Sequence, residues 1–169
     1  MFVKYGLPKD NTSNAITICR TAYEVRYDPI AKVPIWVAYT LKPSHTVGCV
    51  LRSNSFAADK SLPEVARSYV SDYAVSGYDA GHIANDADMS WDDKVERESF
   101  ILSNIAPQTP ELNRGIWRTL EAAVRSWAYN SGDDIAVYAG AIYDMKEGRT
   151  IGPDKVVRSE EHTSELQSH

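Results

Sequence analysis

Runs of β-branched and aromatic residues limit the fold of this chain most strongly. The first 41 residues carry three such runs, at residues 15–19, 22–27 and 34–41, and the second of them alternates polar and apolar residues. A turn signal, Asp28-Pro29, separates the second run from the third, so we expect neighbouring strands of a meander. A later apolar run at residues 135–141 predicts a further buried strand.

One long helical pattern lies between these predicted strands. Within residues 113–130 the apolar positions recur at spacings of three and four, at Ile116, Leu120, Ala123 and Trp127, and Gly132 follows as a stop signal. A sheet flanked by this helix places the chain in the α+β class, with a mixed or antiparallel sheet. Shorter elements are expected as a strand at residues 47–52, a helical turn at 63–73, and a helix end or a strand at 96–105.

Length and charge restrict the classes of function. The 169 residues suit one globular domain, which we place at residues 1–157. The formal net charge of −5 argues against a protein that coats nucleic acid, because such proteins are usually basic, whereas an enzyme needs only a local basic groove. The sequence has no apolar run of about 18 residues, so no transmembrane helix and no membrane partner are expected.

The termini and the cysteines carry weaker signals. Residues 1–8 lack a basic region followed by an apolar stretch, so we expect no signal peptide. Cys19 and Cys49 could form one disulfide or remain two free thiols, and the lack of a dense cysteine framework favours buried thiols.

The last residues do not resemble the rest of the chain. Residues 158–168 read RSEEHTSELQS, which matches in all eleven letters the translation of a common sequencing-adapter read. We interpret residues 158–169 as adapter-derived sequence joined to a truncated gene, with a natural polar tail as the alternative. On this interpretation the genuine C-terminus is missing, and strand edges that it would cover are expected to be bare.

A polar stripe follows the predicted helix. Asn113, Trp117, Glu121 and Arg125 lie four residues apart and therefore share one helix face. An ordinary solvated face is one explanation, and a simple N-cap role for Asn113 is another. Because Asn113 stands at the helix start beside a proline-rich loop, its side chain could instead present an oxygen ligand to a metal ion.

His82 ends the run Tyr78-Asp79-Ala80-Gly81-His82. A lone histidine is more often structural than catalytic, but its unperturbed pKa of about 6.5 makes a neutral imidazole available near pH 7. Together with Asn113 and Glu121, it suits a site in which an imidazole activates water beside a hard metal ion. Such a site is typical of enzymes that cleave phosphodiester bonds.

These motifs resemble those of the DNA/RNA non-specific endonucleases of the ββα-metal (His-Me finger) type. That family has Asp-Arg-Gly-His, then Asn-x-x-Pro-Gln, then an asparagine and a glutamate on a helix. The matching residues here, in this order, are Asp79, Gly81, His82, Asn104, Pro107, Gln108, Asn113 and Glu121. Looser similarity runs from about Lys4 to Pro153, and therefore covers most of residues 1–157.

The resemblance implies a role for each matched residue. His82 is expected to be the general base, and Asn113 the one direct protein ligand of Mg²⁺, with Mn²⁺ as an alternative ion. Glu121 is expected to hold the water molecules around the metal, Asn104 to support the histidine and the metal site, and Arg125 to contact phosphate. The implied substrates are DNA and RNA, cleaved to 5′-phosphate and 3′-hydroxyl ends.

The sequence departs from the family at two arginines. Ala80 replaces the arginine of the first motif, and Ala57 falls where an upstream arginine is expected. Alanine cannot clamp phosphate oxygens with paired hydrogen bonds. The cations that could substitute, although each is more often a surface charge, are Arg52, Lys60, Arg97, Arg114 and Arg118.

Two other functions stay open, and the lost arginines motivate the first of them. One is a catalytically weakened relative that binds nucleic acid without efficient cleavage, and the other is a structural domain with a merely solvated polar stripe. The resemblance favours a secreted, periplasmic or phage-encoded protein, and the sequence leaves the oligomeric state open.

Overall fold

A five-stranded antiparallel sheet forms the centre of the fold. The computed structural model describes residues 6–143, 149–157 and 166–168, and within these the strand order is β1-β2-β3-β6-β9. The bounds are Ile16–Cys19 for β1, Tyr23–Asp28 for β2, Val33–Leu41 for β3, Ile135–Gly140 for β6 and Leu166–Ser168 for β9. The meander expected around Asp28 is confirmed, since β2 pairs antiparallel with both β1 and β3.

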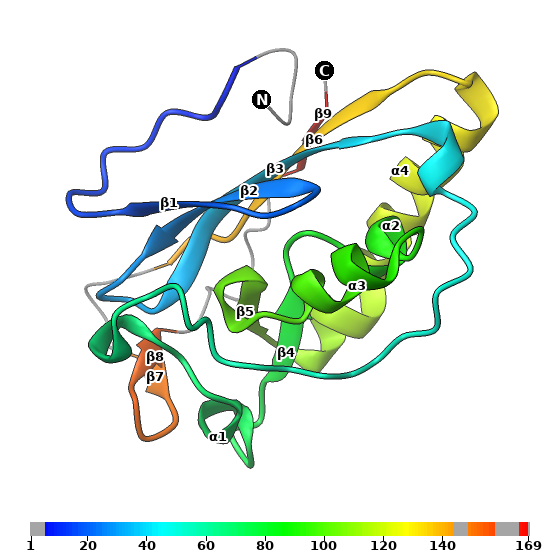
Figure 1. Ribbon diagram of the computed structural model, residues 1–169. Coiled ribbons are helices and arrows are strands. Elements are labelled where there is room, and N and C mark those ends of the chain that lie inside the picture. Colours follow the sequence, from blue (N-terminus) through cyan, green and yellow to red (C-terminus); the bar gives the residue numbers. More distant parts are fainter. Residues whose placement is uncertain (1–5, 144–148, 158–165, 169) are drawn as a thin grey trace.

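Two smaller strand pairs, four α-helices and several short 3₁₀ or π-helical turns accompany this sheet in the described part of the chain. β4 (Asp79–His82) pairs antiparallel with β5 (Ile105–Gln108), and β7 (Thr150–Ile151) with β8 (Val156–Val157). The helices are α1 (Val70–Tyr73), α2 (Asp86–Met89), α3 (Asp93–Ser99) and α4 (Arg118–Ser131). Figure 1 shows α2, α3, α4 and the β4–β5 pair on one side of the large sheet, with the N-terminal segment running along the other.

The main core lies between the sheet and α4. Alternate side chains of β2 and β3 point to this side, and Tyr23, Val25 and Tyr39 are all buried. Burying side chains of this size is the main favourable term in the folding of the domain. The other face of the sheet buries a small cluster around Trp36, and the Tyr138 hydroxyl donates there to the backbone oxygen of Gly6 over 2.7 Å.

The helix turns a different face to the core than its apolar spacing predicts. Ile116 and Trp127 are 72% and 51% exposed, whereas Trp117, Val124 and Ala128 are buried. The expected apolar stripe is therefore wrong at Ile116 and Trp127, whereas Leu120 packs against the core as expected. The stripe of Asn113, Trp117, Glu121 and Arg125 faces β4 instead. The buried side chains are Trp117 within this stripe and the apolar residues beside it.

The start of the helix also differs from the prediction. Residues Leu112–Trp117 form a π-helical turn with a kink at Gly115 (φ −99°, ψ −109°), and regular α-helix begins only at Arg118. The helix expected over residues 113–130 is present, but this kink interrupts it. Consequently Asn113 and Glu121 lie on opposite sides of a kink.

Three short elements can be compared with their predictions. The turn expected at residues 63–73 is confirmed by a 3₁₀ turn at Glu64–Ala66 and by α1. The segment 96–105 is a helix end, since α3 stops at Ser99, and β5 begins at Ile105. The strand expected at residues 47–52 is wrong, because the backbone there docks on Ser90, whose oxygen accepts the Val50 N–H at 2.9 Å.

The remaining expectations concern the cysteines, the helices and the tail. Cys19 and Cys49 are free and exposed, so the expectation of buried thiols is wrong. Among the described residues, no helix has the length and apolar character needed to cross a membrane. Residues 158–165 and 169 of the tail lie outside the described residues, while Leu166–Ser168 pair with β6, whose edge is thus not bare.

Candidate active site

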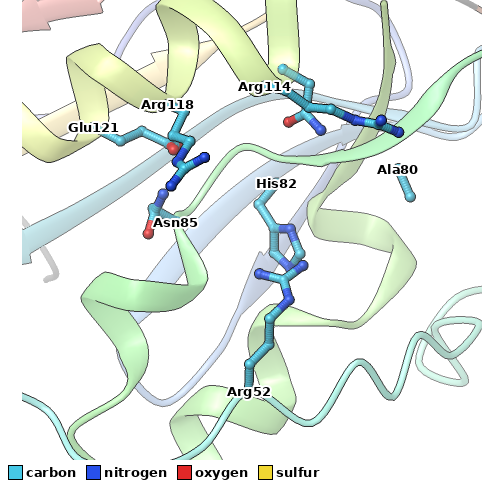
Figure 2. Close-up of a pocket in the computed structure, with 8 residues that line it drawn as sticks. Arg52, Ala80, His82, Asn85, Arg114, Arg118 and Glu121 are labelled. Atoms are coloured by element: carbon cyan, nitrogen blue, oxygen red, sulfur yellow. The ribbon is translucent and has the colours of Figure 1, made fainter. Parts of the chain in front are cut away.

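A cleft of about 260 Å³ lies where β4 meets the kinked start of α4 (Figure 2). It is lined by Arg52, Ala80, His82, Asn85, Asn113, Arg114, Arg118 and Glu121. The structure therefore brings together His82, Asn113 and Glu121, which the sequence motifs single out. Asn104 and Arg125 lie behind the cleft and do not line it.

His82 occupies an apolar wall of the cleft. It is the last residue of β4, is only 7% exposed, and its ring contacts Phe56 and Phe100 at centroid distances of 5.5 and 4.7 Å. This burial lowers the pKa of His82 to about 4, because the charged imidazolium loses its hydration. The imidazole is consequently neutral at pH 7, and its buried Nε2 has no hydrogen-bond partner among the described residues.

Asp79 orients the side chain of Asn113. One carboxylate oxygen of Asp79 accepts hydrogen bonds from Asn113 Nδ2 at 2.9 Å and Arg114 Nε at 2.7 Å, and the other accepts from the Arg114 guanidinium at 2.6 Å. The Arg114 guanidinium holds the pKa of the Asp79 carboxyl below its ordinary value. Since the amide nitrogen of Asn113 donates to Asp79, the amide oxygen Oδ1 of Asn113 is the atom left to bind a metal ion.

Glu121 stands on α4, beyond the kink. Burial raises the pKa of Glu121 to about 7, a hydrogen bond from Asn85 opposes that shift, and the negative charge of Asp88 adds to it. A cation in the cleft would reverse the shift, because an opposite charge favours the ionised carboxylate. A metal ion in the cleft and the ionised carboxylate of Glu121 would therefore stabilise each other.

Asn104 supports the site from the interior. It is fully buried, its Oδ1 accepts the Ala84 N–H at 2.8 Å, and its Nδ2 donates to the backbone oxygens of Ala84 and Ser99 at 2.9 and 2.8 Å. These bonds tie the chain just after His82 to the end of α3. Asn104 thus positions β4, and its side chain does not reach the cleft.

Arg125 is held away from the cleft by its own partners. Its guanidinium pairs with Asp88 and donates to Asn85 Oδ1 at 3.1 Å. Asn85, which the sequence motifs do not single out, also caps α2 by accepting the Ala87 N–H at 2.7 Å. Its position just before two aspartates in a short helix is the N-cap pattern that could have drawn attention to it.

The two alanines in place of arginines lie in different places. Ala80 lines the cleft directly, whereas Ala57 forms an isolated bridge to Ile101. Of the candidate substitutes, Arg52, Arg114 and Arg118 line the cleft, and Lys60 and Arg97 do not. Arg52 forms an ion pair with Asp86, and its guanidinium lies 4.9 Å above the ring of Phe100.

The donors at the cleft fit a hydrated Mg²⁺ or Mn²⁺. Among the described residues, no cluster of three or more histidine, cysteine or acidic side chains could enclose a metal. The available donors are instead the amide oxygen of Asn113 and the carboxylate of Glu121, both hard oxygen ligands. Mg²⁺ keeps several of its waters and is commonly held by one or two protein oxygens, so this sparse set suits it.

Comparisons with known proteins agree with the fold and the motifs. The model of the DNA/RNA non-specific endonuclease family matches residues 2–162. The chain is 36% identical over 141 residues to "Endonuclease G, mitochondrial" of Homo sapiens, covering 83% of this chain and 46% of the relative. It is 33% identical over 134 residues to "Nuclease" of Nostoc sp., covering 79% of this chain and 48% of that protein.

A solved structure gives the same result for the fold. The crystal structure of the EndoG/EndoGI complex aligns with a TM-score of 0.78 and 30% identity, covering 90% of this chain and 71% of that chain. The chain belongs to the DNA/RNA non-specific endonuclease family, and its α+β fold is that of the ββα-metal nucleases. It spans less than half the length of the two curated relatives described above.

Proposed function

We propose that this chain is a metal-dependent endonuclease that hydrolyses the phosphodiester bonds of both DNA and RNA. The observation that carries the proposal is the cleft that His82 shares with Asn113 and Glu121. It combines a neutral imidazole with two oxygen donors, which are the groups needed to activate water beside a hard cation. The family of the chain supports the same reaction.

His82 would act as the general base. Its imidazole lines the cleft and is neutral at pH 7, so it can take a proton from the attacking water. A pKa of about 4 makes for a weak base in the free protein. A substrate phosphate beside the ring would raise that pKa, because a negative charge favours the imidazolium.

Asn113 and Glu121 would hold Mg²⁺ or Mn²⁺ on the helical side of the cleft. When bound there, the ion supplies positive charge that stabilises the scissile phosphate and the leaving oxygen. Asp79 keeps the Asn113 oxygen available for this purpose. Glu121 loses its proton more readily once a cation is near, and it can then orient the water around the ion.

The cations of the cleft fit a substrate backbone rather than particular bases. Arg52, Arg114 and Arg118 line the cleft, and arginine binds phosphate oxygens in a fork geometry. Contacts of this kind carry no sequence information, so we expect low sequence specificity and marked salt sensitivity. Hydrolysis is expected to leave 5′-phosphate and 3′-hydroxyl ends.

Nicking of supercoiled plasmid and cleavage of a labelled RNA test the proposal. The wild-type chain should cut both substrates in Mg²⁺, and neither in EDTA. His82→Ala should lower the rate by about 10²- to 10⁴-fold, the usual effect of losing a general base. His45→Ala is the matched control, because His45 stacks on Trp91 and does not line the cleft.

The same assay separates the alternative of a weakened nucleic-acid-binding relative. Ala80, which lines the cleft where the family motif has an arginine, is the observation that favours this alternative. If the wild type cuts no faster than His82→Ala but still retards DNA on a gel, the alternative is correct and the enzyme proposal fails.

A further inference from the structure

The arginines around the cleft differ in whether their charge is already compensated. Three of them are paired with an aspartate: Arg52 with Asp86, Arg114 with Asp79, and Arg125 with Asp88. Arg118 has no ion-pair partner and no side-chain hydrogen bond within the part of the chain that the structure describes. It is exposed and lines the cleft, so its charge is free to attract an anion.

The position of Arg118 relates it to the proposed metal site. It is the first residue of α4, three residues before Glu121, and side chains at this spacing share a helix face. Figure 2 shows Arg118 extending toward Asn85 on one side of His82, while Arg114 and Ala80 lie on the other side. The uncompensated positive charge is therefore on the Glu121 side of the cleft.

A metal ion in the cleft would make the place of Arg118 more favourable for an anion. Mg²⁺ held by Asn113 and Glu121 would repel the Arg118 guanidinium, unless a negative group lay between or beside them. None of the three aspartates provides that group, because each already pairs with another arginine. A phosphate of a bound nucleic-acid strand has the charge and the paired oxygens that a guanidinium binds best.

We propose that Arg118 binds a backbone phosphate of the nucleic acid on the Glu121 side of the cleft, and so makes a contact that Ala80 cannot make from β4. This inference rests on the proposed function for its substrate class. The contact forms in the bound substrate as well as in the transition state. Its loss should therefore raise KM more than it lowers kcat.

Binding measured without cleavage tests this contact. We would use the His82→Ala chain in Mg²⁺, a short fluorescent DNA duplex, and fluorescence anisotropy over a series of salt concentrations. Adding Arg118→Ala should weaken binding and reduce the steepness of log Kd against log salt by about 0.9, the value for one lost phosphate contact on duplex DNA. Arg118→Lys should keep that steepness, because it retains the charge.

Arg97→Ala is the matched control, since Arg97 is an exposed arginine of α3 that does not line the cleft. It should leave the salt dependence unchanged. If Arg118→Ala changes the salt dependence no more than Arg97→Ala does, the inference is wrong. Circular dichroism of each variant checks that the fold is retained.

Failure of this inference can be told apart from failure of the proposed function. If the wild-type chain does not cleave, but Arg118→Ala reduces the salt dependence of binding as expected, Arg118 binds phosphate and the catalytic proposal is wrong. If the chain cleaves and Arg118→Ala leaves both KM and the salt dependence unchanged, the catalytic proposal holds and the assignment of Arg118 is wrong.

Discussion

The two walls of the cleft are built by opposite physical means. On the β4 wall, His82 is held by packing against Phe56 and Phe100, and little of it reaches solvent. On the helical wall, Asn113 and Arg114 are more exposed and are held by hydrogen bonds to Asp79. Apolar packing thus fixes the candidate base, and polar contacts fix the candidate metal ligand.

The two walls are alike in one electrostatic property. Burial pushes both titratable groups toward their neutral forms, by lowering the pKa of His82 to about 4 and raising that of Glu121 to about 7. A cleft with two neutralised groups and an uncompensated arginine is suited to bind a cation and an anion together. A bound metal ion would favour the ionised carboxylate of Glu121, and a bound phosphate would favour the imidazolium form of His82.

The largest effect is expected from removing the internal support of the β4 wall. Asn104→Ala leaves the N–H and oxygen of Ala84 and the oxygen of Ser99 buried without their partner. Unsatisfied buried groups of this kind should cost about 4 kcal/mol of unfolding free energy in total. Thermal unfolding should therefore show a fall in Tm of roughly 10 °C.

Asn130→Ala is the control for this variant, because Asn130 is exposed and its side chain donates a hydrogen bond to the Ser126 hydroxyl. Its Tm should stay within about 2 °C of the wild type. Equal losses in the two variants would show that the β4 wall does not depend on Asn104.

The packing of His82 predicts a pH dependence of stability. Its pKa is lower in the folded chain, about 4, than in the unfolded chain, where about 6.5 is usual. Between these values the unfolded state binds the extra proton, so stability should fall as the pH drops from 6.5 to 4, by about 3 kcal/mol. Urea unfolding at several pH values measures this change.

The same measurement on His82→Gln isolates the histidine. Glutamine does not titrate, so the variant should lose this part of the pH dependence. If the wild type and the variant lose the same stability between pH 6.5 and 4, the imidazole is not desolvated as described.

The helical wall should respond to the loss of charge at Asp79. Asp79→Asn weakens the hydrogen bonds that orient Asn113 and Arg114. Losses of this kind behind a metal ligand usually cost about 10- to 100-fold in metal affinity or activity. The Mg²⁺ concentration for half-maximal plasmid nicking should rise accordingly.

Asp10→Asn is a control of the same chemistry, since Asp10 also pairs with an arginine, Arg26, and does not line the cleft. It should leave the Mg²⁺ requirement unchanged. A shift of equal size in both variants would mean that Asp79 has no particular role at the site.

The smallest effect is expected from the tail, which belongs to neither wall. Deletion of residues 158–169 removes three residues that pair with β6. A short edge strand contributes little, so Tm should change by less than about 2 °C and nicking should be unaffected. A fall of several degrees would show that the pairing with β6 supports the sheet.

The sequence predicted the strands and the motif residues better than the helix. Strands β2, β3 and β6 follow from β-branched and aromatic runs, because such residues favour a half-buried pleated surface. The apolar spacing of α4 indicated a helix but not which face is buried. Trp117 and Val124 are buried, while Ile116 is not, since the choice depends on where the sheet and β4 lie.

The site was predictable in its residues but not in its environment. The motifs predicted that His82 and Asn113 lie close together. They gave no sign of the kink at Gly115 or of the burial that lowers the pKa of His82. The sequence also does not show which arginines form ion pairs. In the described part of the chain, the positions of the aspartates distinguish Arg118, which has no ion-pair partner there, from its neighbours.

One measurement tests most directly whether the imidazole of His82 lies beside a cation that the amide oxygen of Asn113 holds. Mn²⁺ suits the same oxygen ligands as Mg²⁺, and it broadens NMR signals of nearby nuclei with a steep dependence on distance. Titration with Mn²⁺ should broaden the ring signals of His82 before those of His45, and Asn113→Ala should abolish this order. Broadening of His82 that is absent, or that persists unchanged in Asn113→Ala, would contradict the account.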